Sequence, residues 1–195
     1  VNQVTTRLLS RRRFGDLPPR TSALPCVDGC FIDRPTAMSD LRERIESGSR
    51  LVNITGPTGV GKTRLARQWA TRFEGTGQGE VALVQLGHAI DETDLHLATG
   101  LALGLSLNKE KRGSLDERVG HAISSRGPLV MILDDFPSTL DTAPLATWLH
   151  SAPQTKLILT SIRPIDSSQA THLQLGMMEP EEATALFLAR SHRKL

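Results

Sequence analysis

The chain has 195 residues, of which 38% are apolar, enough for one globular domain with a hydrophobic core of its own. Only 4% are aromatic and none is Tyr, so aliphatic side chains must fill that core. The formal net charge of +2 argues against a domain built to bind polyanions, and no apolar run is long enough for a membrane-spanning helix or a signal peptide.

Residues 1–30 are predicted to be a basic linker or tail, because they contain prolines and glycines without hydrophobic periodicity. The cluster Arg11–Arg13 could contact nucleic acid, but arginines without interleaved aromatic residues fit a solvated tail better. Direct nucleic-acid binding is therefore not expected. Cys26 and Cys30 lack a second pair that would complete a zinc site, and they are interpreted as free thiols in a reducing cytoplasm.

Folded structure is expected to begin near Phe31. Met38, Leu41 and Ile45 have the spacing of one face of a helix. Residues 50–55 then predict a short buried strand. The stretch that follows carries the strongest motif of the chain.

Residues 56–63 read Gly-Pro-Thr-Gly-Val-Gly-Lys-Thr, which matches the phosphate-binding loop G-x-x-x-x-G-K-[ST]. The glycines let successive backbone N–H groups point at phosphate oxygens. Lys62 adds a positive charge near the β- and γ-phosphates, and Thr63 offers a hydroxyl to Mg²⁺. A helix that begins at Lys62 would direct its N-terminal dipole at the anion. The alternative is a glycine-rich turn without a ligand.

Strands and helices then alternate, which predicts a mainly parallel sheet covered by helices on both faces. Asp91 and the capping box at residues 114–117 mark helix starts. The last helix begins at Pro180, with Ala183, Leu186 and Phe187 expected to face inward. The further strands are predicted at residues 80–87, 129–134, 156–160 and 171–175. No metal-ligand spacing links the six histidines, which are interpreted as surface or boundary residues: His88, His96, His121, His150, His172 and His192.

The apolar residues 129–133 lead into two adjacent carboxylates, Asp134 and Asp135. The carboxyl end of a strand is where an open α/β sheet places its ligands. Asp134 is expected to hold Mg²⁺ through a water molecule, and Asp135 to polarise the attacking water. A simple turn signal is the alternative for these acids.

Together these motifs resemble the STAND class of signal-transduction ATPases, which includes NB-ARC domains. The resemblance is strongest to the ATPase modules of large bacterial transcriptional regulators of the LuxR and antibiotic-pathway-activator types. It covers residues 31–190 and is carried by the segments 31–34, 53–66, 129–136, 159–161 and 173–187. It implies an α/β P-loop NTPase three-layer sandwich with a five-stranded, mainly parallel sheet. In this AAA-like order, one strand lies between the P-loop strand and the acidic strand.

The resemblance also implies a nucleotide site. The first motif would lie near the base or ribose, although Asp33 replaces the family's glycine. Ile162 stands where the family has a sensor arginine and Arg163 comes one residue later, so its side chain is expected to point the other way. The candidate catalytic residues are Lys62, Asp134, Asp135 and Arg163, and the candidate metal ligands are Thr63 and Asp134. The candidate nucleotide-binding residues are Phe31, Ile32, Arg34, Gly56, Pro57, Thr58, Gly59, Val60, Gly61, Lys62, Thr63 and Arg64.

The expected function is an ATP- or ADP-binding switch with slow Mg²⁺-dependent hydrolysis, in a cytoplasmic signal-transduction or transcription regulator. Residues 31–195 would form the nucleotide-binding domain, truncated before the family's helical lid. The implied partners are nucleotide and further domains (lid, winged helix, sensor repeats and DNA-binding domain), together with nucleotide-dependent self-association, but no membrane. The alternatives are a non-hydrolysing P-loop scaffold and a small phosphotransferase, whose acceptor pocket and arginine-rich lid are not visible in the sequence.

Overall fold

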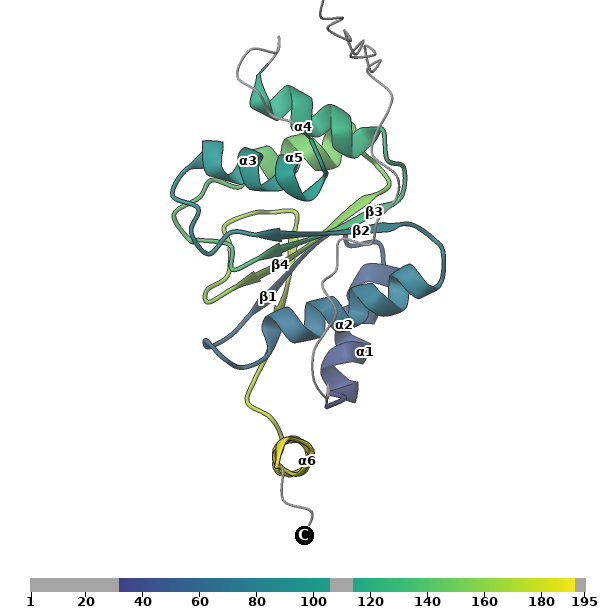
Figure 1. Ribbon diagram of the computed structural model, residues 1–195, viewed down its shortest axis with the longest axis vertical. Coiled ribbons are helices and arrows are strands. Elements are labelled where there is room, and N and C mark those ends of the chain that lie inside the picture. Colours follow the sequence, from purple (N-terminus) through teal and green to yellow (C-terminus); the bar gives the residue numbers. More distant parts are fainter. Residues whose placement is uncertain (1–31, 106–113, 192–195) are drawn as a thin grey trace, which may run out of the picture.

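The computed structural model describes residues 32–105 and 114–191 (Figure 1). The predictions for the basic tail, Cys26, Cys30, Phe31 and His192 lie outside the described residues. Among the described helices, none is both long and apolar enough to cross a membrane.

The strands form one five-stranded parallel sheet in the order β2-β3-β4-β1-β5. Strand β4 pairs with β1 on one side and with β3 on the other, so Ile158 lies between Val52 and Ile132. This confirms the expected strand between the P-loop strand and the acidic strand. The strands are β1 (Leu51–Thr55), β2 (Glu80–Gln85), β3 (Leu129–Asp134), β4 (Thr155–Ser161) and β5 (Ala170–Gln174).

Helices cover both faces of the sheet, as the alternating pattern predicts. In Figure 1, α1 and α2 lie on one face and α3, α4 and α5 on the other. Side chains of β3 alternate between the two layers: Val130 and Ile132 join the core under α1 and α2, whereas Met131 and Leu133 join the other. The helices are α1 (Pro35–Glu46), α2 (Lys62–Gly75), α3 (Glu92–Ala102), α4 (Leu115–Ser124), α5 (Ala143–Ser151) and α6 (Pro180–Arg190).

Side-chain caps stabilise the two predicted starts of α3 and α4. Asp91 accepts a hydrogen bond from the backbone N–H of Asp94 at 2.9 Å. Ser114 and Glu117 form the reciprocal capping box of α4, with both hydrogen bonds at 3.1 Å. These caps satisfy backbone N–H groups that have no partner inside the helix.

The prediction that the last helix packs its apolar face inward is wrong. Helix α6 has no buried residue, Ala183 is exposed and Phe187 is 69% exposed. Figure 1 shows α6 apart from the layers that cover the sheet. The apolar spacing predicted the helix correctly, but such spacing does not specify which element the apolar face packs against.

The prediction for His96 is also wrong, because this side chain is buried at 3% exposure. Its Nε2 lies 3.1 Å from Asp116 Oδ1, which also accepts a hydrogen bond from the Trp148 indole at 3.0 Å. The imidazole meets the Trp148 ring edge-on, with ring centroids 5.6 Å apart. The interface of α3, α4 and α5 thus supplies a polar partner that allows His96 to be buried.

Candidate nucleotide site

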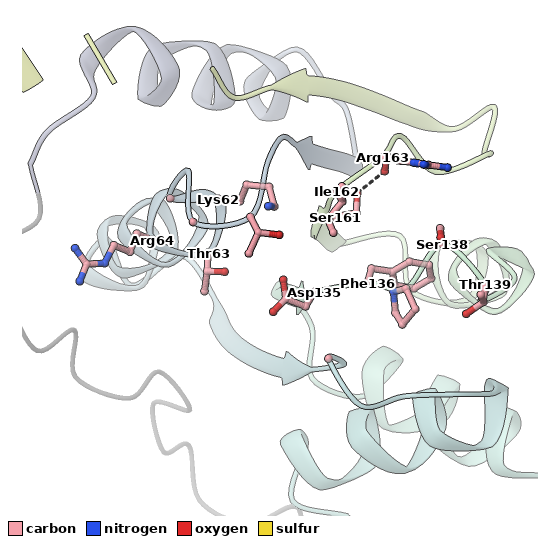
Figure 2. Close-up of a pocket in the computed structure, with 15 residues that line it drawn as sticks. Lys62, Thr63, Arg64, Asp135, Phe136, Ser138, Thr139, Ser161, Ile162 and Arg163 are labelled. Carbon is pink, nitrogen blue, oxygen red and sulfur yellow. Dashed lines mark hydrogen bonds between the residues drawn. The ribbon is translucent and has the colours of Figure 1, made fainter. Parts of the chain in front are cut away.

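A cavity of about 800 Å³ opens where the carboxyl ends of β1, β2, β3 and β4 meet (Figure 2). It brings together eight candidate residues from three separate parts of the chain: Thr58, Gly59, Gly61, Lys62, Thr63 and Arg64 after β1, Asp135 after β3, and Arg163 after β4. The rest of the lining consists of Gly87, Phe136, Pro137, Ser138, Thr139, Ser161 and Ile162. The candidate residues Gly56, Pro57, Val60 and Asp134 are not among the lining residues. The cavity has the size of a small-molecule site and lies where parallel α/β sheets bind their ligands.

The loop at residues 56–63 has the backbone that its glycines predict. Gly56, Gly59 and Gly61 have φ angles of 151°, 82° and 103°, which side-chain-bearing residues rarely adopt. Gly61 precedes the first residue of α2, Lys62, as expected. The Lys62 ammonium is folded over the loop and donates hydrogen bonds to the carbonyls of Gly56 at 2.9 Å and Pro57 at 3.0 Å. Helix dipole and ammonium together make this end of the cavity suited to an anion.

Thr63, which lines the cavity, contacts Asp134, which is not among the lining residues. The Thr63 hydroxyl donates a 2.6 Å hydrogen bond to Asp134 Oδ1, and the Thr160 hydroxyl donates a second one of 2.7 Å to the same oxygen. Asp134 is 6% exposed and is the last residue of β3. The motif residues that follow β1 and end β3 are therefore in direct contact, although β4 separates the two strands in the sheet.

Asp135 has a different environment from its neighbour. It lies beyond the end of β3, with a φ of 55°, and its exposed side chain lines the cavity. Its backbone N–H donates a 2.9 Å hydrogen bond to the Thr160 hydroxyl. In Figure 2 its carboxylate lies between the P-loop residues and Phe136. A buried acid beside Thr63 and an exposed acid on the cavity wall can carry separate roles.

Thr63 and Asp134 together fit Mg²⁺. A hydroxyl oxygen and a carboxylate are hard oxygen donors, and Mg²⁺ is usually held by one or two protein oxygens while it keeps several waters. The 2.6 Å contact places the Thr63 hydroxyl and the Asp134 carboxylate together before any ion binds. These two residues would hold the ion.

Arg163 lines the cavity, but in Figure 2 its guanidinium points away from Lys62 and Thr63. Its backbone carbonyl accepts a 2.6 Å hydrogen bond from the Ser161 hydroxyl. Ile162, which stands at the position expected from the sequence resemblance to hold an arginine, is 65% exposed and lines the cavity. The expected effect of the one-residue shift on contact with a nucleotide stays a prediction.

Sequence reasoning missed Asn53, which is fully buried in the middle of β1. Its amide donates to the Ser161 hydroxyl at 2.8 Å and accepts from the backbone N–H of Ile165 at 3.1 Å. It therefore supports the segment that carries Ile162 and Arg163. A polar amide inside an otherwise apolar strand was the available signal.

Neither Ile32 nor Arg34 is among the residues that line the cavity. The Arg34 side chain is instead buried, with 8% exposure. Its guanidinium donates to the carbonyls of Val60 at 3.3 Å, Gly176 at 3.0 Å and Met177 at 3.0 Å, and pairs with Glu182 at 3.2 Å. Arg34 thus joins the P-loop to the segment between β5 and α6. Its predicted contact with the base or ribose stays a prediction.

Replacing Arg34 with Met should destabilise the protein by about 3 kcal/mol, because Glu182 would lose its partner in a partly buried site. For a chain of this length that corresponds to a decrease of roughly 6–12 °C in Tm. Arg42→Met is the matched control, since Arg42 forms an exposed pair with Glu46 on the same helix. Equal melting temperatures of the two variants would contradict the proposed role of Arg34.

Residues 44–162 match the family described as AAA domain, which covers more than half of the chain. The chain belongs to the AAA domain family. It is a nucleotide-binding P-loop module of the AAA type, and its sheet has the arrangement described above. This AAA module is similar to uncharacterized proteins of Mycobacterium tuberculosis and Mycobacterium bovis, with 28% identity over 166 residues. The match covers 84% of this chain and 41% of those relatives, so the chain spans less than half of their length.

Solved structures share the fold of this chain. Cdc6p from Pyrobaculum aerophilum superposes with a TM-score of 0.63 at 13% identity, over 89% of this chain and 52% of that one. The AAA domain of FIGL-1, solved in complex with ADP, gives a TM-score of 0.51 at 16% identity, over 84% and 61% of the two chains. At these identities the likeness shows a shared fold only.

Proposed function

We propose that this AAA module is a nucleotide-operated switch that binds ATP or ADP with Mg²⁺ and hydrolyses ATP slowly. The observation that carries the proposal is the contact of Thr63 with Asp134, next to the Lys62 ammonium at one end of an 800 Å³ cavity. That arrangement supplies a cation, a helix N-terminus and a magnesium site for one triphosphate.

The module would work in the cytoplasm as part of a bacterial STAND-class (NB-ARC-like) regulator of transcription. The matched relatives are longer than this chain, which leaves room for further domains such as a lid, a winged helix, sensor repeats and a DNA-binding domain. Nucleotide-dependent self-association belongs to the same proposal. The resemblance of residues 53–66 and 129–136 to that class supports it.

In the proposed mechanism, the backbone N–H groups of the loop and the N-terminus of α2 bind the phosphates, and Lys62 adds its charge. Thr63 and Asp134 would hold Mg²⁺, which neutralises negative charge on the phosphoryl group when bound. The exposed carboxylate of Asp135 orients the attacking water from the cavity wall. The presence of Lys62, Thr63 and Asp135 in the cavity lining, and the contact of Thr63 with Asp134, support these roles.

A non-hydrolysing scaffold is the second candidate. It is favoured by the guanidinium of Arg163, which points away from the P-loop, and by Ile162 at the sensor position. Calorimetric titration with ATP and ADP, each with and without Mg²⁺, tests whether the module binds nucleotide at all. A switch should bind both nucleotides and gain affinity for ATP when Mg²⁺ is added, whereas absence of binding in all four titrations would refute it.

Steady-state hydrolysis by this chain should be slower than about one turnover per second, because the guanidinium groups of the two arginines in the cavity lining, Arg64 and Arg163, point away from Lys62 and Thr63 in Figure 2. Phosphate release from purified protein measures it, with the Lys62→Ala variant as the background. A faster rate that disappears in that variant would show that the module is a complete enzyme by itself.

The two carboxylates should separate by role. Asp134→Ala should weaken Mg²⁺-dependent ATP binding, because it removes the acid that contacts Thr63. Asp135→Ala should leave binding unchanged and lower the single-turnover rate of hydrolysis, since a group that orients water acts mainly on the transition state. Calorimetry and single-turnover assays measure the two effects. If both variants lose only binding, the assigned roles are wrong.

A further inference from the structure

One side chain, Thr160, contacts both acids of the site. It lies near the end of β4 with 0% exposure. Its hydroxyl donates a 2.7 Å hydrogen bond to Asp134 Oδ1 and accepts a 2.9 Å hydrogen bond from the backbone N–H of Asp135. A hydroxyl has one proton to donate and lone pairs to accept, so these two bonds use it in both ways.

On the Asp134 side, the hydroxyl fixes a carboxylate. Thr63 of α2 and Thr160 of β4 both donate to Oδ1, at 2.6 Å and 2.7 Å. Hydrogen bonds to a charged oxygen are stronger than those between neutral groups. The carboxylate cannot rotate about its side-chain bonds without losing one of the two donors, so the pair of hydroxyls sets its orientation.

On the Asp135 side, the hydroxyl stabilises an unusual backbone conformation. Among the described residues other than glycine, Asp135 alone has a positive φ, at 55°. The turn is attached to β4 twice: the Asp135 N–H donates to the Thr160 hydroxyl, and the Phe136 N–H donates to the Thr160 carbonyl at 2.8 Å. Such backbone conformations persist where the surrounding contacts determine them, and they are frequent at functional sites.

We propose that Thr160 is a positioning residue that places both acids of the nucleotide site with a single hydroxyl. It orients Asp134 for the metal ion and directs Asp135 into the cavity. The magnesium part of this inference rests on the proposed function, whereas the turn at Asp135 is a property of the protein without any ligand. The P-loop motif assigns Thr63 but gives Thr160 no role.

Three variants of the whole chain test the proposal. Thr160→Val keeps the shape of the side chain and removes the hydroxyl, and Thr160→Ser restores it. Thr155→Val is the matched control, because Thr155 is also a 0% exposed threonine of β4, and its hydroxyl has no hydrogen-bond partner among the described residues. The Kd of ATP is measured by calorimetry with Mg²⁺ and with EDTA. The ratio of the two Kd values gives the gain in ATP affinity that depends on Mg²⁺, called here the Mg²⁺-dependent gain.

In Thr160→Val the Mg²⁺-dependent gain should fall by about tenfold or more, while the Kd in EDTA changes by less than about twofold. Thr160→Ser and Thr155→Val should behave as the unaltered protein. A full gain in Thr160→Val would overturn the proposal, and so would an equal loss in Thr155→Val or a loss of the same size in EDTA.

Amide hydrogen exchange of Asp135 in the free protein gives a readout that needs no nucleotide. Exchange should be about tenfold faster in Thr160→Val than in Thr155→Val, because the N–H loses its acceptor. If the unaltered protein binds no nucleotide, the proposed function fails, and the exchange rate still decides the role of Thr160. An unchanged rate would overturn it.

Discussion

Replacing Lys62 with Ala should reduce ATP binding at least a hundredfold, to below detection in a calorimetric titration. The ammonium lies over the P-loop, on the carbonyls of Gly56 and Pro57, and is the buried cation of the cavity end where the phosphates would bind. One charge-assisted hydrogen bond contributes roughly 1.5–3 kcal/mol, and Lys62 would contact two phosphate groups. The loss should therefore approach the whole affinity of a weakly bound nucleotide.

The matched control is Lys156→Ala, because Lys156 is a partly buried lysine that also donates to a backbone carbonyl, that of Ile45 at 3.4 Å. It belongs to β4 and is absent from the lining of the cavity. Its removal should leave the Kd of ATP unchanged. Unaltered binding by Lys62→Ala, or equal losses in both variants, would refute the nucleotide site.

Local chemistry made much of this fold predictable. The start of α2 follows from Gly61 and Lys62, because a glycine with positive φ ends the loop where the helix begins. The start of α4 follows from the pair Ser114 and Glu117, since each side chain caps a backbone N–H of the other. Both helix starts depend on residues at most a few positions apart, so they can be predicted from the local sequence alone.

Features that depend on neighbouring elements could not be predicted in this way. Thr160 meets Asp134 across 26 residues of sequence, and only the pairing of β4 with β3 brings them together. His96 is buried because Asp116 of a different helix supplies its partner. Phe187 has the spacing of a buried residue, but no described element covers it, and it remains exposed.

The order of the strands lies between these two cases. Alternating strands and helices predict a parallel sheet, but local patterns do not say which strand lies beside which. The position of β4 between β1 and β3 was expected from the resemblance of the motifs to a known class, and the structure confirms it. That order places Thr160 and Ser161 between the P-loop strand and the acidic strand, where both contribute hydrogen bonds to the site.

Gly56→Ala should cause the largest loss of stability of any single methyl group added to the P-loop. A Cβ at Gly56 would lie 2.5 Å from the carbonyl oxygen of Leu175 and 3.3 Å from Val60 Cγ1. The backbone at Leu175 cannot move away freely, because its N–H donates a 2.7 Å hydrogen bond to the Thr55 carbonyl. The segment that follows is held by Arg34 through the carbonyls of Gly176 and Met177.

The φ of 151° at Gly56 adds backbone strain to this collision, so a control has to separate the two effects. Gly48→Ala provides it, since Gly48 has a φ of 99° and a Cβ there would have no atom within 4 Å. Strain of this kind alone costs about 1–2 kcal/mol. Gly56→Ala should cost about 4 kcal/mol, and thermal unfolding should show a Tm at least several degrees below that of Gly48→Ala. Equal melting temperatures would mean that the segment after β5 moves away to accommodate the added methyl group. Arg34 would then not fix this segment against the P-loop.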